Sequence, residues 1–158
     1  MNSTSRIHQV FENGKGIFRM TPAWVARRFN QPGQRLRLHP NDYFALGMQR
    51  GAIKERWFSS VVAASMDPNV PWDEGMSYIA AGENPTDKIL FKEAISELGT
   101  DLIGAELMEK YGTWPMYSKF FDYKLALFHH LHLDDNAAKR VSRLGKPEAY
   151  YFPAQLNS

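Results

Sequence analysis

The residues best suited to chemistry lie in one stretch of the chain, residues 125–152. Its first part alternates leucines with other side chains, so an extended strand would place His130 and His132 on the same face. Two imidazoles at this spacing can bind a single metal ion. A polar segment and Gly145 follow, and then a second apolar run with Glu148 at its start. If this run pairs beside the first strand, the pattern predicts a divalent transition-metal site with two nitrogen ligands and one carboxylate.

Simpler explanations exist for several of these residues. Histidines at this spacing also occur on surfaces or in partly buried polar strands that bind no metal. His129 falls on the leucine face, where a core or supporting histidine is expected. Asp134 and Asp135 have the chemistry of acid–base groups, but their position after the strand is typical of residues that open a turn. Because the chain has no cysteine, any metal must be held by nitrogen and oxygen ligands.

Length and composition indicate one ordinary globular domain. Of the 158 residues, 44% are hydrophobic and 23% are charged, which is enough apolar material for a real core. The net charge of +2 and the lack of a Lys/Arg block argue against a nucleic-acid partner. No window resembles a membrane span, and the N-terminal residues lack the apolar segment of a signal peptide. We therefore expect a single domain over residues 1–158, cytoplasmic, without a membrane partner.

The pattern along the rest of the chain predicts mainly strands. Alternating or β-branched runs favour strands at four places before the stretch with the histidines. These places are residues 34–39, 55–64, 76–80 and 116–121. Residues 1–20 predict a loose arm or an edge strand. Thr21 and Pro22 have the residue types of a helix start, so a short helix is expected after them.

One helical block interrupts the predicted strands, at about residues 86–111. A helix is expected over 86–98, where apolar side chains recur on one face, and a second helix over 101–111. Gly99 and Gly112 follow these segments, as is typical of helix ends. A strand-rich chain with one helical insertion is typical of a β-sandwich or a β-barrel decorated by helices.

The segments LALFHHLHLDD and GKPEAYYF resemble the metal-binding core of class I mannose-6-phosphate isomerases, which belong to the cupin superfamily. That family carries Gln-x-His, and later Lys-x-Glu, on neighbouring strands of a jelly roll. The resemblance implies that His132 and Glu148 are metal ligands and that Lys146 is the family's lysine. His130 stands where the family has a metal-bound glutamine, so a competent ligand is retained.

The resemblance covers roughly residues 50–157, including the segments RWFS and ILFKEAISELGTDLIG and the strand SKFFD. It implies a mainly β, cupin-type jelly-roll sandwich with a divalent metal, zinc being favoured. It also implies the interconversion of mannose 6-phosphate and fructose 6-phosphate. Lys119 and Lys146 would be catalytic and would bind the phosphorylated sugar, and Tyr150 would wall the substrate site. Solvated lysines and a tyrosine that packs in the core are the simpler alternatives.

Departures from the family pattern open alternative functions. The family's fourth ligand, a histidine in a later strand, and an assisting arginine would lie after the last residue of this chain. The expected jelly roll is therefore incomplete, with open strand edges. We expect a longer protein or a partner chain, as in a homo-oligomer, to complete it; water is an alternative fourth ligand. One alternative function is a non-catalytic metal- or sugar-binding cupin module, and another is a cupin oxygenase, whose iron would accept the same ligands.

Overall fold

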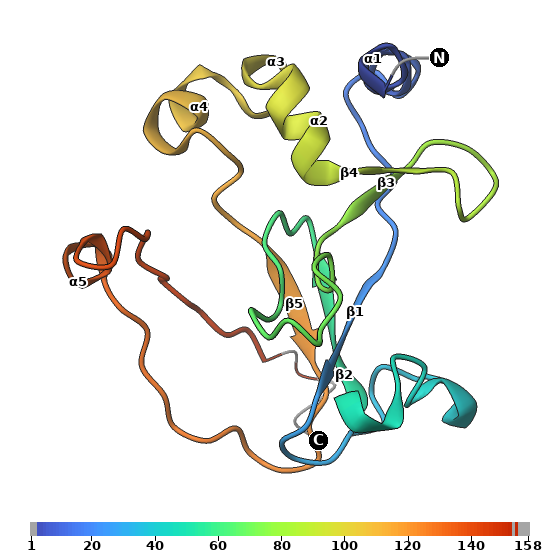
Figure 1. Ribbon diagram of the computed structural model, residues 1–158, viewed down its shortest axis with the longest axis vertical. Helices are drawn as coiled ribbons and strands as arrows, with labels where there is room; N and C mark the ends of the chain where they lie inside the picture. Colours follow the sequence, from blue (N-terminus) through green and yellow to red (C-terminus); the bar gives the residue numbers. More distant parts are fainter. Residues whose placement is uncertain (1–2, 153, 155–158) are drawn as a thin grey trace. The chain divides into compact units, whose positions relative to one another are not determined.

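The computed structural model describes residues 3–152 and 154, and it forms two compact units (Figure 1). The first unit ends at Ala126 and the second begins at Leu127. Two compact units can both belong to one domain, so the single domain expected over residues 1–158 stays a prediction. Residues 1–2, 153 and 155–158 of that range lie outside the described residues.

A three-stranded antiparallel sheet in the order β1-β2-β5 lies in the first unit. Its strands are β1 (Ala23–Arg27), β2 (Ala52–Phe58) and β5 (Ser118–Phe121). The middle strand, β2, pairs on both sides: Glu55 lies opposite Val25 of β1 and opposite Phe121 of β5. Because both edges of β2 are paired and most of its side chains are buried, its charged residues need partners within the protein.

A two-stranded sheet packs with two helices in an apolar cluster of the first unit. The strands β3 (Tyr78–Ala80) and β4 (Lys88–Leu90) pair antiparallel. Ile79 and Ile89 from these strands pack in one core with Ile7 of α1 (Ser3–Asn13) and with the buried face of α2 (Phe91–Leu98). None of the helices within the described residues has the length and apolar character needed to cross a lipid bilayer.

Four short helical segments complete the first unit, and one helix lies in the second, among the described residues. The first unit has the 3-10 helices η1 (Pro40–Asp42) and η2 (Met48–Arg50). After α2 come α3 (Thr100–Ile103) and α4 (Ala105–Tyr111), which Gly104 separates with its φ of 86°. In the second unit, α5 spans Asp135–Lys139.

The structure confirms strands and a helical block within residues 86–111, but helices and strands are mixed and the expected mainly β fold is not confirmed. The described residues form two small sheets and no barrel. The predicted helix over 86–98 begins only at Phe91, because residues 88–90 pair with β3. The predicted helix over 101–111 is broken at Gly104, whose positive φ is outside the helical region.

Several local predictions were wrong. The arm expected over residues 1–20 contains α1, whose Ile7, Val10 and Phe11 follow helical spacing and pack on the apolar cluster. The helix expected after Pro22 is strand β1, because pairing with β2 and the burial of Val25 outweigh the local helix-start signal. The strand expected over residues 34–39 has no ladder partner.

The prediction of a strand over residues 125–133 is also wrong, since this segment belongs to no sheet of the described residues. A single backbone bond joins its end to the later segment: the N–H of Lys146 donates to the carbonyl of Leu133 at 3.0 Å. The two segments that carry the predicted metal ligands therefore meet without forming a hairpin ladder.

Candidate metal centre

Three of the residues predicted to bind a metal lie together in the second unit. The ligand atoms of His130, His132 and Glu148 all lie within 4.8 Å of one another, and Nε2 of His132 is 2.9 Å from Oε2 of Glu148. Ligand atoms around a tetrahedral zinc ion are about 3.3 Å apart, given zinc–ligand distances of about 2.0–2.1 Å. The donor set and its spacing therefore fit a divalent transition metal after small side-chain rotations.

Local backbone interactions hold the two ligand-bearing segments together. Asp134 is the N-cap of α5, and its carboxylate accepts a 2.7 Å hydrogen bond from the N–H of Ala137. At the other end of this loop, the N–H of Gly145 donates to Oδ1 of Asp135 at 3.1 Å. A Cβ at position 145 would lie 2.6 Å from the backbone nitrogen of Asp135, so the close approach requires glycine here. Asp134 and Asp135 thus build the loop, in agreement with their expected turn role.

The orientation of His130 is set by its own backbone neighbourhood. Nδ1 of His130 lies 3.0 Å from the carbonyl of Phe128. A carbonyl can only accept, so Nδ1 carries a proton, and in the neutral ring Nε2 is then the nitrogen with the lone pair. A hydrogen bond of this kind is the usual support for a metal-binding histidine, because it fixes the tautomer and the ring orientation.

Two further side chains contact the carboxylate of Glu148. The hydroxyl of Tyr150 donates to Oε1 at 2.5 Å, and Nζ of Lys146 lies 2.9 Å from Oε2. Nζ of Lys146 is also 3.1 Å from Nε2 of His132. Lys146 and Tyr150, predicted as catalytic or substrate-binding residues, are therefore in direct contact with the candidate ligands.

Lys119, the other predicted catalytic and substrate-binding lysine, belongs to the first unit. Its Nζ lies 3.7 Å from Oε2 of Glu55, and it also sits over the rings of Trp57 and Phe121, at 5.2 and 4.3 Å from their centroids. The side chain of Lys119 is largely buried against these groups. The groups found around the ammonium of Lys119 are thus the carboxylate of Glu55 and the rings of Trp57 and Phe121.

Sequence reasoning missed the polar cluster around Glu55, whose side chain is 2% exposed. The carboxylate accepts from Arg27 at 2.8 Å (Nε) and 3.3 Å (Nη2), and from Nε1 of Trp57 at 2.7 Å. It also accepts from the hydroxyl of Tyr123. These four donors fill the acceptor positions of the carboxylate, so it has no lone pair left for a general base. The cluster joins β1, β2 and Tyr123, the second residue after β5.

The charges of this cluster keep Glu55 ionised. Burial alone would raise the pKa of Glu55, but the hydrogen bond and charge of Arg27, with the charge of Lys119, outweigh it and lower the pKa. Burial and the neighbouring carboxylate raise the pKa of Tyr123, so its hydroxyl remains a donor. The sequence signal of this cluster was the charged run Lys54-Glu55-Arg56 inside β2, because a charged residue in a buried strand needs partners within the protein.

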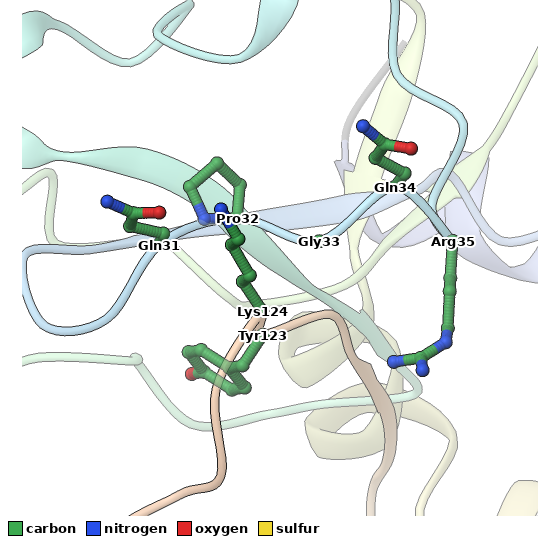
Figure 2. Close-up of a pocket in the computed structure, with 7 residues that line it drawn as sticks. All are labelled: Gln31, Pro32, Gly33, Gln34, Arg35, Tyr123 and Lys124. Atoms are coloured by element: carbon green, nitrogen blue, oxygen red, sulfur yellow. The ribbon is translucent and has the colours of Figure 1, made fainter. Parts of the chain in front are cut away.

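An open hollow of about 740 Å³ lies elsewhere in the first unit. Its wall is formed by Gln31, Pro32, Gly33, Gln34, Arg35, Tyr123 and Lys124. Figure 2 shows Lys124 extending toward Pro32, whereas Gln34 and Arg35 point away from each other. These lining residues include no histidine and no carboxylate, so they do not form a metal centre.

Comparison of the chain with protein-family models, with curated proteins and with solved structures gives no match. The side chains that meet in the second unit are therefore the features of this chain that point to a function.

Proposed function

We propose that this chain holds a divalent metal, with zinc favoured, through His130, His132 and Glu148, and that it acts as an aldose–ketose isomerase of the mannose-6-phosphate type. The observation that carries the proposal is that the ligand atoms of these three residues lie within 4.8 Å of one another, although the two histidines precede α5 in the sequence and the glutamate follows it. Three protein ligands that leave a further position for water or substrate are typical of catalytic zinc sites.

The surrounding residues support a role with an anionic sugar. A bound divalent ion would supply Lewis-acid chemistry for moving a carbonyl between neighbouring carbons. Lys146, whose Nζ lies beside two ligand atoms, would offer a positive charge to a substrate oxygen or phosphate. Tyr150 would keep the carboxylate of Glu148 in place, and Lys119 stays a proposed substrate contact.

The proposal includes a cupin-type jelly roll. The antiparallel sheets β1-β2-β5 and β3-β4 are compatible with parts of such a sandwich. The carboxylate network of Glu55, which joins three neighbouring segments, would then stabilise the scaffold of the first unit.

Elemental analysis of the purified protein tests the metal site. We expect about one equivalent of zinc or a similar ion in the parent protein, lost in His132→Ala and in Glu148→Ala. His129→Ala is the matched control, because His129 is an exposed neighbour outside the group of three ligands and should keep the metal. A parent protein without bound metal, even after reconstitution, would overturn the proposal.

A non-catalytic metal-binding module is the second candidate, and the exposure of the site favours it. The side chain of His132 is 31% exposed and that of Glu148 is 18% exposed, whereas catalytic sites usually exclude water. A coupled assay for conversion of mannose 6-phosphate to fructose 6-phosphate separates the two candidates. Bound metal without turnover supports the binding module, and turnover lost in His132→Ala supports the isomerase.

A further inference from the structure

Lys146 contacts the same two atoms that a metal would bind. Its Nζ is 3.1 Å from Nε2 of His132 and 2.9 Å from Oε2 of Glu148, and these two atoms are 2.9 Å from each other. The three atoms thus form a nearly equilateral triangle with the ammonium at one corner. An ammonium group at this position neutralises the carboxylate as an ion would.

The chemistry of the groups makes the two cations mutually exclusive at His132. An ammonium group has only donors, so in the His132 tautomer with an unprotonated Nε2, which is the form that can bind a metal there, the contact directs a hydrogen at the nitrogen's lone pair. An imidazole nitrogen has one lone pair, and a metal–nitrogen bond uses it. The carboxylate oxygen of Glu148 must likewise give up part of its ion pair with Lys146 when a metal binds.

The surroundings of Lys146 allow its side chain to leave. The side chain is 40% exposed, so rotation about its flexible stem would take the ammonium into solvent without opening a packed core. Its backbone N–H remains bonded to Leu133, so the loop that brings the ligands together does not depend on the ammonium.

We propose that Lys146 is an internal competitor of the metal: its ammonium occupies the cation position between His132 and Glu148 and is displaced when a divalent ion binds. This inference rests on the metal-binding part of the proposed function. It assigns to Lys146 control over the affinity of the site, beyond the substrate contact that the motif implies.

The test is a titration with Co²⁺, followed by the visible absorption of the bound ion, on the parent chain and three variants. Lys146→Met removes the competing charge and should tighten Co²⁺ binding about tenfold or more, which corresponds to about 1.4 kcal/mol. Lys146→Arg keeps a cation at this position and should bind about as weakly as the parent. Lys139→Met removes one positive charge from an exposed position of α5 in the same unit and should change the affinity less than about twofold, because an exposed charge is screened.

The outcomes separate this inference from the proposed function. If the parent binds Co²⁺ and Lys146→Met binds it equally or more weakly, the competitor role is wrong and the metal site stands. If Lys139→Met tightens binding as much as Lys146→Met, the effect is one of net charge, and the competitor role is again wrong. If neither the parent nor Lys146→Met binds Co²⁺, the metal site itself is wrong, and the inference falls with it. Lys146→Gln repeats the test should the methionine variant fail to fold.

Discussion

Replacing Arg27 by methionine should strongly destabilise the first unit. Arg27 makes two of the hydrogen bonds to Glu55, at 2.8 and 3.3 Å, and its Nη1 donates to the carbonyl of Ala64 at 3.2 Å. Methionine fills a similar volume but cannot donate, so a buried carboxylate would keep only part of its partners. The 2% exposure of Glu55 leaves little water to replace the lost donors.

The expected loss follows from the cost of leaving a buried charge without its partner. Breaking such a pair from one side costs about 3–5 kcal/mol. A domain of this size has a total stability of about 5–15 kcal/mol, so the loss is at least about a fifth of the total and can approach all of it. In Arg27→Met/Glu55→Gln the charge that needs compensation is gone, so the loss should be clearly smaller than the sum of the two single losses.

Urea unfolding followed by tryptophan fluorescence measures this effect in the first unit alone. All the tryptophans of the chain precede residue 127: Trp24, Trp57, Trp72 and Trp114. Arg28→Met is the control, because the exposed side chain of Arg28 bonds only a surface carbonyl, that of Gln49, and its loss should cost less than about 1 kcal/mol. A loss in Arg27→Met as small as that of the control, or strict additivity in the double variant, would refute the reasoning.

Three further outcomes are expected. The folded state lowers the pKa of Glu55 below its ordinary value of 4.5. The stability that the ionised Glu55 contributes is therefore complete above that pH and is lost as the pH falls through the folded-state pKa. Urea unfolding between about pH 5 and 2 should accordingly show a shallower pH dependence in Glu55→Gln than in the parent protein. Gly33→Ala should lower the stability of the first unit by about 1–3 kcal/mol in urea unfolding, because the new Cβ would collide with the buried carboxylate of Asp122, and the loss should shrink in an Asp122→Ala background. Asp134→Ala removes the N-cap of α5 and should cost about 1 kcal/mol of helix stability and weaken Co²⁺ binding about fivefold. Asn136→Ala in the same helix is the control and should leave Co²⁺ binding unchanged. Equal Co²⁺ affinities of the two variants would show that the cap does not support the site.

The sequence predicted the meeting of the candidate metal ligands better than the fold around them. An extended backbone sends alternate side chains the same way whether or not it belongs to a sheet, so His130 and His132 converge although their segment forms no strand. The position of Glu148 was expected from a hairpin, whereas it depends on the capped helix α5 and one backbone bond. Local spacing was sufficient for the first pair and insufficient for the third ligand.

Tertiary pairing explains most of the errors in the fold. Thr21 and Pro22 are residue types that often begin a helix, yet strand β1 follows them because it pairs with β2. This pairing joins residues far apart in the sequence, so the residues around position 22 do not reveal it. The predicted strand over 55–64 overlaps β2, which begins earlier, at Ala52, and ends at Phe58. The Glu55 cluster joins residues 27, 55 and 123, and contacts over such separations cannot be read from the spacing of neighbouring residues.

The bond between Lys146 and Leu133 closes a loop whose interior makes no contribution to the ligand set. For a flexible loop, the entropy lost on closure grows only with the logarithm of its length, so doubling the loop costs about 0.6 kcal/mol. Insertions among the exposed residues 140–144 should therefore add little closure entropy as long as the cap of α5 and the bond from Gly145 to Asp135 are kept. A sequence signature for this kind of site should fix the short pairs His-x-His and Lys-x-Glu and leave the interval between them open, because chain length there is under little physical constraint.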